Sequence, residues 1–174
     1  MRAVALLIAL SAASAFADEA VPPALALKVM LKVLSYDPAL ATHGSGDFVV
    51  AIPFSANVEA AAALVKECDA LEVKTLNERP LRFVAMPVKD LDAKKPTAVL
   101  LLDSVADDVR ADALKWSLGA KAYSLALGAD EVSNGALLGV GVSNGKPQPI
   151  INATTAKALN ADFKAVLRLA RVVQ

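Results

Sequence analysis

Two short, unbroken runs of apolar residues constrain the fold of this 174-residue chain more than any other feature. Residues 48–52 (FVVAI) and 98–102 (AVLLL) hold no polar position, which is typical of strands buried on both faces of a sheet. A helical pattern follows each run, over residues 58–68 and 105–118. Because strands that alternate with helices are typical of a parallel sheet covered on both faces, the chain is predicted to be an α/β protein.

Single residues predict where these elements begin and end. Pro53 has no N–H to give to a neighbouring strand, so it should end the first strand. The Asn57 side chain stands where it can accept hydrogen bonds from the first N–H groups of the helix over 58–68. Gly119 stands just after the helix over 105–118, at a place that favours glycine because the backbone there turns left-handed.

The remaining patterns complete one domain over residues 18–174. A helix is predicted over 24–34, strands over 71–76, 81–88 and 122–127, and a helical turn over 130–134. Extended runs at 136–142 and 148–152 flank Asn144-Gly145, a strong signal for a hairpin turn. A final helix or pair of helices is expected over 154–173, with a break near Asn160. The predicted fold is a single three-layer Rossmann-like α/β domain with a mainly parallel sheet and a C-terminal antiparallel hairpin.

The first residues have the pattern of a secretory signal peptide. Met1 and Arg2 form a short basic start, residues 3–10 are apolar, and Ala15-Phe16-Ala17 fits the small-residue rule for signal peptidase. The apolar stretch is shorter than the roughly 20 residues that a membrane-spanning helix needs. We therefore expect cleavage after Ala17, a signal peptide over residues 1–17, and a mature protein that works in the periplasm without membrane insertion.

Composition excludes several classes of function. Lys and Arg together number 18, as do Asp and Glu, so the net charge is zero and binding to nucleic acid is not expected. A single Cys and a single His cannot build a structural zinc site or a disulfide framework within one chain. The sequence therefore predicts no metal and no cofactor.

Three features carry candidate chemistry, each beside a plainer explanation. His43 lies in a Gly/Ser loop where a general base could stand, but no acid is fixed near it, so a solvated loop histidine is the favoured explanation. Asp103, Asp107 and Asp108 follow a strand, at the edge where open α/β sheets bind ligands, yet carboxylates at a helix start also suit the helix dipole. Cys68 is expected to be a buried, inert thiol, with an intermolecular disulfide as the alternative.

Several segments resemble the YfiR family of exported bacterial proteins. That family ends in a Gly-led strand, a turn, a strand closing on Ile-Asn, an Ala-rich helix and a Leu-Leu-x-Leu-Ala segment. The matching segments here are residues 134–142 (NGALLGVGV), 144–147 (NGKP), 150–157 (IINATTAK) and 166–170 (VLRLA). Residues 25–37 (LALKVMLKVLSYD) resemble the family's opening helix, and 81–88 and 99–103 fall where it has its middle strands. The resemblance thus covers nearly all of residues 18–174.

The resemblance implies a periplasmic regulator without catalytic activity. The best understood members bind the periplasmic sensor part of an inner-membrane diguanylate cyclase, which lowers cyclic-di-GMP and biofilm formation. The residues carried over are all expected to be structural, with Asn152 placed to cap the next helix or to tie down the hairpin; they are Gly135, Asn152, Leu167, Leu169 and Ala170. Redox control through an intramolecular disulfide, which such members use, is excluded because Cys68 is the only cysteine.

Three functional hypotheses follow. The first is a non-enzymatic regulator that restrains the sensor domain of an inner-membrane signalling protein, with homodimerisation as an option. The second is a periplasmic carrier or sensor of a small ligand, with its site at the carboxyl ends of the strands near Asp103 and Leu127. The third, a hydrolase using His43, has the least support because no partner for the histidine is evident.

Overall fold

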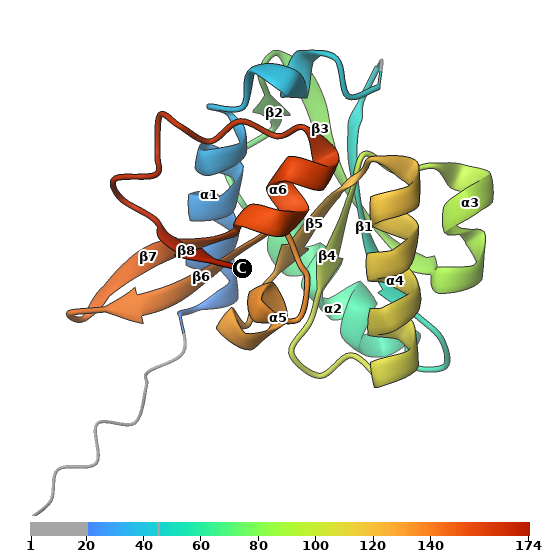
Figure 1. Cartoon of the computed structure of the whole chain (residues 1–174). Helices are drawn as coiled ribbons and strands as arrows, with labels where there is room; N and C mark the ends of the chain where they lie inside the picture. The colour runs from blue at the N-terminus through green and yellow to red at the C-terminus, as the bar shows by residue number, and fades with distance from the viewer. Residues whose placement is uncertain (1–20, 45) are drawn as a thin grey trace, which may run out of the picture.

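The computed structural model describes residues 21–44 and 46–174, and the predicted signal peptide over residues 1–17 lies outside them. Figure 1 labels the helices and strands. In chain order these elements are α1 (Pro23–Leu34), η1 (Pro38–Ala41), β1 (Phe48–Phe54), α2 (Val58–Asp69), β2 (Thr75–Leu76), β3 (Arg79–Pro87), η2 (Val88–Asp90), α3 (Leu91–Lys94), β4 (Ala98–Leu101), α4 (Asp107–Ala120), β5 (Tyr123–Ala126), α5 (Ala129–Ser133), β6 (Leu138–Ser143), β7 (Lys146–Asn152), α6 (Ala153–Leu159) and β8 (Arg171–Val173), where η marks a 3-10 helix.

The strands form one sheet in the order β2-β3-β1-β4-β5-β6-β7-β8. Strands β3, β1, β4, β5 and β6 run parallel, whereas β2 pairs antiparallel with β3 and β7 antiparallel with β6. The chain places β3 on one side of β1 and then crosses to place β4 on the other side. The α/β class, the mainly parallel sheet and the antiparallel hairpin predicted from the sequence are confirmed.

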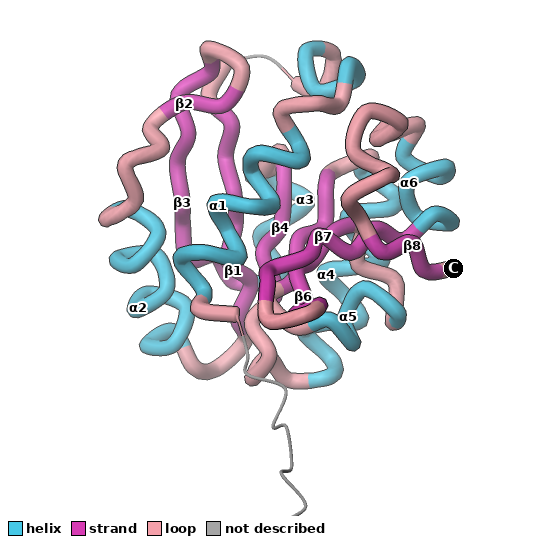
Figure 2. The backbone as a smooth tube through the Cα atoms, turned by 90° about the vertical axis from the view of Figure 1, so that its left-hand side faces the viewer, coloured by secondary structure: helices cyan, strands magenta, loops and turns pink. Residues whose placement is uncertain are grey.

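Helices cover both faces of the sheet, which gives three layers. Helices α1 and α2 lie over one face and α3 and α4 over the other, while α5 and α6 lie beside the curled end formed by β6 to β8 (Figures 1 and 2). The larger apolar core packs under α1 and α2 and includes Met30, Phe48 and Leu125. A smaller core under α3 and α4 includes Leu101 and Ala113. No helix in the described part of the chain is both long and apolar enough to span a membrane.

The first strand runs through Pro53, so the prediction that this proline ends it was wrong. The Val49 carbonyl accepts from the Thr97 N–H, which shows that odd-numbered residues of β1 direct their backbone groups toward β4. Pairing with β4 stops at Ala51, whereas pairing with β3 continues to Phe54. The missing N–H of Pro53 therefore lies on a side where no ladder bond is made.

Helix α4 ends at Ala120, so the prediction that Gly119 leaves the helix was also wrong. The left-handed residue is Lys121, with φ 57°. Its N–H donates to the Leu118 carbonyl and that of Ala122 to the Ser117 carbonyl, which closes the last turn. The Lys121 ammonium also donates to the Ala158 carbonyl at 2.5 Å, and this bond to α6 compensates for the strained backbone.

The first of the two strands predicted on either side of residues 77–80 is much shorter in the structure than predicted. The strand expected over 71–76 is reduced to the two residues of β2, because the chain before it turns and only Thr75–Leu76 pair with β3. The turn that joins β2 to β3 consists of Asn77 and Glu78, both with positive φ, which suits a tight two-residue hairpin.

The C-terminal segment is a helix for only seven residues. The expected break at Asn160 is confirmed by its φ of 57°, but the helix does not resume after it. The Asp162 N–H instead donates to the Asp37 carboxylate at 3.1 Å, and Phe163 and Val166 turn into the core. The chain then ends in β8, which pairs parallel to β7, so the helix predicted up to residue 173 was wrong in this part.

Candidate functional site

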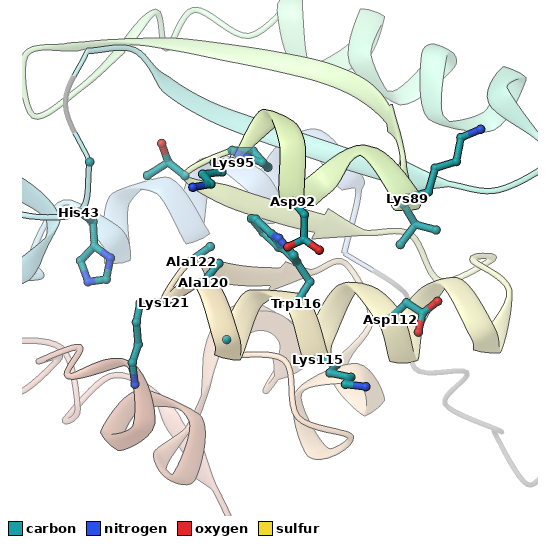
Figure 3. A pocket seen from close by; sticks show the side chains of 15 residues that line it. His43, Lys89, Asp92, Lys95, Asp112, Lys115, Trp116, Ala120, Lys121 and Ala122 are labelled. Carbon is teal, nitrogen blue, oxygen red and sulfur yellow. The ribbon is translucent and has the colours of Figure 1, made fainter.

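An open cavity of about 720 Å³ lies between α3 and α4, at the amino ends of the strands β4 and β5. Thr97 and Ala122, which immediately precede these two strands, contribute to its floor. Figure 3 shows the cavity with α3 above it, α4 below it and His43 on one side. Its lining residues are His43, Gly44, Val88, Lys89, Asp92, Lys95, Pro96, Thr97, Asp112, Lys115, Trp116, Gly119, Ala120, Lys121 and Ala122.

Two left-handed residues shape the cavity by turning the chain from a helix into a strand. Lys95 has φ 47° at the end of α3, and Lys121 has φ 57° at the end of α4. Each is followed within three residues by the strand it leads into, β4 or β5. The two helix ends and the two strand entries therefore meet at one place, although they come from separate segments of the chain.

The charged residues around the cavity are predominantly basic. Four lysines and two aspartates line it, in a protein whose net charge is zero. Lys121 is engaged elsewhere, since its ammonium donates to the Ala158 carbonyl. In Figure 3 the Lys95 ammonium lies on the side of the cavity where His43 and Ala122 are found, whereas Lys89 and Lys115 extend away from the middle. The cavity can therefore attract a small anion.

His43 is held in place by contacts on both its ring and its backbone. Its ring lies 4.6 Å from the Tyr123 ring, centroid to centroid, at an angle of 43°. Its carbonyl accepts a 2.7 Å hydrogen bond from the Arg79 guanidinium. The side chain is half-buried, so a freely solvated loop histidine, which the sequence allowed, does not describe it. No hydrogen bond or ion pair joins the ring to a carboxylate among the described residues.

Arg79 organises the loop that carries His43. Its guanidinium donates to four backbone carbonyls, those of Leu40, His43, Gly46 and Asp47, at 2.7 to 3.5 Å. It also lies over the Phe48 ring, 5.4 Å from the centroid. No local sequence pattern indicates that the Arg79 side chain contacts residues more than 30 positions earlier in the chain.

A buried hydrogen bond lies behind His43. The Tyr123 hydroxyl donates to Asp37 at 2.8 Å, and both residues are almost completely buried. Burial, together with the Asp37 carboxylate, raises the pKa of Tyr123 well above its usual range. The wall of the cavity at His43 is therefore supported by a tyrosine that stays protonated and keeps one fixed orientation.

At the carboxyl ends of the parallel strands, on the opposite side of the molecule from the cavity, side chains pack closely against one another. Asp103 lies so close to Gly128 that a Cβ on this glycine would be 2.6 Å from the carboxylate. The Arg110 Nε lies 2.7 Å from the Glu131 Oε2, and Arg110 also pairs with Asp107. A void beside Leu127 has no room for a water molecule. The void beside Leu127, at the site expected near Asp103 and Leu127, is therefore too small for a ligand, whereas the 720 Å³ cavity lies at the other ends of the strands.

The three aspartates singled out in the sequence have separate roles. Asp107 and Asp108 lie in the first turn of α4, as the dipole argument expects, and Asp108 accepts from the Val109 N–H at 2.9 Å. Asp103 precedes the helix without capping it, because the residue before α4 is Ala106. No group of three or more His, Cys, Asp or Glu in the described part of the chain is arranged to hold a metal ion.

The residues carried over from the resemblance lie near α6 and at the end of the chain. Asn152 is buried and makes two bonds: its carbonyl oxygen accepts from the Thr155 N–H and its amide donates to the Val132 carbonyl. Gly135 has φ 117°, a backbone conformation that favours glycine. Leu167 and Leu169 are exposed, by 43% and 71%, and Ala170 is partly buried against the core.

Comparison with known proteins identifies structures with a similar fold but no matching family. No protein-family model and no curated protein matches the sequence. Solved structures do match. An ABC domain from Streptococcus pneumonia in complex with L-Trp is 14% identical, with a TM-score of 0.61 over 87% of this chain and 60% of that one. A conserved domain protein from Vibrio cholerae is 16% identical, with a TM-score of 0.54 over 88% and 60% of the two chains.

A third solved structure adds to the pattern. The ligand-free, open structure of a substrate binding protein with adhesive properties from Clostridium difficile is 12% identical, with a TM-score of 0.55 over 86% of this chain and 60% of that one. The chain thus spans about 60% of each of the three matched structures. It has an α/β fold that is also found in substrate-binding proteins, at identities that establish the fold alone.

Proposed function

We propose that this protein binds a small organic ligand in the cavity between α3 and α4, and that it acts outside the cytoplasm as a carrier or sensor without catalytic activity. The observation that carries this proposal is the cavity itself. Its volume of about 720 Å³ lies within the range of roughly 300 to 1,000 Å³ that is common for small-molecule sites. The likeness to substrate-binding proteins adds support, because it shows a fold that serves such a role elsewhere.

The direct test is a thermal-shift screen of the purified protein with a broad panel of metabolites. A ligand present at 100 times its dissociation constant stabilises the folded state by about 2.7 kcal/mol, which raises the melting temperature by several degrees. The Ala120→Phe variant places a phenyl ring in the cavity and should abolish the shift by excluding the ligand from this part of it. Ala111→Phe, on an exposed position of the same helix outside the lining, should keep it. A panel without any stabilising compound would contradict the proposal.

Export to the periplasm is part of the same proposal. It rests on the signal-peptide pattern, which predicts a mature N-terminus at Asp18. N-terminal sequencing of the protein recovered from a periplasmic extract tests it, with Ala15→Leu and Ala17→Leu as variants that should block cleavage. A chain that retains Met1 and stays with the cytoplasmic fraction would contradict it.

A second function, regulation of a membrane signalling protein, is favoured by the exposed apolar side chains near the C-terminus. Leu167, Leu169 and Val172 are exposed by 43%, 71% and 48%. The first two belong to the segment that resembles the YfiR family, whose members bind the sensor domain of a diguanylate cyclase. Apolar side chains gathered in one exposed segment are common at contacts with other proteins.

This second proposal has its own test. Gene deletion should raise cyclic-di-GMP, and in-cell cross-linking should recover an inner-membrane protein. Leu167→Ser should weaken the cross-link, whereas Leu25→Ser should not, although Leu25 in α1 is exposed to the same extent, 42% against 43%. Unchanged cyclic-di-GMP together with the absence of a membrane partner would contradict it, and cross-links between two copies alone would indicate a homodimer instead.

A further inference from the structure

Three lysines of the cavity lining, Lys89, Lys95 and Lys115, take part in no ion pair or side-chain hydrogen bond among the described residues, whereas the Lys121 ammonium donates to the Ala158 carbonyl. Of these three, Lys95 has its ammonium on the side of the cavity where His43 lies, while Lys89 and Lys115 extend away from the middle (Figure 3). Lys95 is exposed, and its left-handed backbone directs the side chain over the strand entries. A lysine in this position presents a point charge with three donors to whatever enters the cavity.

A second donor, His43, lies on the same side of the cavity as this lysine (Figure 3). The His43 ring packs on Tyr123, and Arg79 fixes the backbone of the same residue, so the imidazole cannot swing freely into solvent. A neutral imidazole has one N–H donor, and a charged one has two. Lys95 and His43 therefore supply donors from two separate elements, and a carboxylate can accept from both because it has two acceptor oxygens.

The rest of the cavity suits an apolar body. Trp116 is half-buried on α4 and presents part of its indole to the cavity, beside Pro96 and Ala122. A bare inorganic anion would leave most of the 720 Å³ filled by water alone. An aromatic or aliphatic group would instead displace this water from apolar side chains, which is favourable.

We propose that the ligand is a small organic carboxylate, with its anionic group between Lys95 and His43 and its apolar body against Trp116. This inference rests on the proposed function and narrows it to a ligand class. The two aspartates of the lining, Asp92 and Asp112, add to the selection because they disfavour a body that carries a second negative charge.

Trp116 makes the test site-specific, because it is the only tryptophan of the chain. Its fluorescence, excited at a wavelength that phenyl rings do not absorb, reports binding in this cavity. The probes are benzoate, phenylacetate and hexanoate, each compared with the amide and the amine of the same body. We expect a saturable fluorescence change with at least one carboxylate, and a response at least ten times weaker for its amide and amine.

Variants separate the ligand class from the site. Lys95→Met should weaken carboxylate binding about tenfold or more, and His43→Phe should weaken it while keeping the packing on Tyr123. Lys157→Met removes the same charge from an exposed position of α6 outside the cavity and should change binding less than twofold. Circular dichroism spectra and melting temperatures establish that each variant is folded.

Four outcomes are distinguishable. Selective carboxylate binding that depends on Lys95 supports the inference. Equal or tighter binding of an amide or amine that Ala120→Phe abolishes overturns the ligand class and leaves the proposed function standing. If none of the nine probes changes the Trp116 fluorescence, the carboxylate class of ligand is wrong. If every compound that stabilises the protein in the metabolite panel also stabilises Ala120→Phe, the cavity is not the binding site.

Discussion

The Tyr123 hydroxyl donates a 2.8 Å hydrogen bond to the Asp37 carboxylate, and this bond joins two residues that are 86 positions apart. The other carboxylate oxygen of Asp37 accepts from the N–H groups of Ala39 and Asp162. One buried side chain thus connects the start of β5, the turn after α1 and the segment after α6. Since the Tyr123 ring also supports His43, the same connection reaches the wall of the cavity.

Removal of the Tyr123 hydroxyl should destabilise the protein measurably. In Tyr123→Phe the ring still packs, but a buried carboxylate oxygen loses its donor, which costs about 1 to 3 kcal/mol. Urea unfolding followed by circular dichroism measures this loss. The matched control is Tyr36→Phe, because Tyr36 is 45% exposed and its hydroxyl makes no hydrogen bond with a described residue. Equal effects of the two substitutions would contradict the structural role given to the buried pair.

Much of the fold could be predicted because its signals are local. The apolar runs at residues 48–52 and 98–102 are strands, the Asn57 side chain caps α2, and Asn144-Gly145 forms the hairpin turn with φ values of 52° and 70°. The path of the chain after Asn160 could not be predicted, because the apolar spacing of Phe163 and Val166 is also typical of a helix. Its actual path is decided by the distant Asp37, which binds the Asp162 N–H.

The cavity could not be predicted for a related reason. Its residues come from the loop before β1, from both ends of α3 and from the last turns of α4, and only the sheet brings these segments together. Trp116 on its own has the pattern of a core residue, and Lys95 that of a solvated helix end. The expectation of a site near Asp103 followed the usual rule for parallel sheets, but the void beside Leu127 has no room for a water molecule.

Replacement of Arg79 should loosen the loop that carries His43. Lysine keeps the charge but cannot donate to four carbonyls at once, so Arg79→Lys should cost about 2 to 3 kcal/mol. It should also weaken ligand binding through a less ordered His43. Arg82→Lys serves as the control, since Arg82 makes only an exposed ion pair with Asp47 and should lose less than about 1 kcal/mol. Chemical unfolding measures the free energy of unfolding of both variants. Similar losses of stability in the two would contradict the role given to Arg79.

Replacement of a glycine by alanine should lower the free energy of unfolding at one position and raise it at another. Gly139 lies in β6, where a Cβ would come within 2.5 Å of a Val132 methyl group and 3.1 Å of the Ala126 carbonyl oxygen. We expect Gly139→Ala to lower the free energy of unfolding by about 1 to 3 kcal/mol. Gly119 lies inside α4 with open space around it, so Gly119→Ala should raise the same quantity by about 0.5 to 1 kcal/mol. Thermal unfolding of the two variants measures both signs, and a loss of stability in Gly119→Ala would contradict the helical position of this residue.

The single thiol should be unreactive while the protein is folded. Burial, with a smaller effect of Asp69 and Glu67, raises the pKa of Cys68 from its ordinary value of 9.0 to about 12. At pH 8 an aromatic disulfide reagent should therefore react only as fast as the protein opens, and should react fully in urea. Because the unfolded chain forms the thiolate first, Cys68 also contributes a loss of stability as the pH rises above about 9. Rapid labelling of the native protein, or a disulfide-linked dimer through Cys68, would contradict this prediction.

The buried ion pair of Arg110 and Glu131 should make stability depend on pH in a defined direction. Burial raises the pKa of Glu131, and the neighbouring Arg110 only partly offsets this effect. In the pH range between its ordinary pKa of 4.5 and the raised value, the folded protein binds more protons at this residue than the unfolded chain does. The contribution of Glu131 to stability is therefore greatest below that range and is lost as the pH rises through it.

The comparison of Glu131→Gln with the original protein isolates this contribution, because glutamine has a similar shape and does not titrate. The stability of the original protein relative to the variant should fall as the pH rises from 4 to 8. Glu72→Gln, an exposed residue in the loop after α2, should show no such trend and serves as the control. Unfolding free energies measured across this range supply the test. A relative stability that increases with pH would mean that Arg110 dominates and that the buried carboxylate is held as a fully stabilised anion.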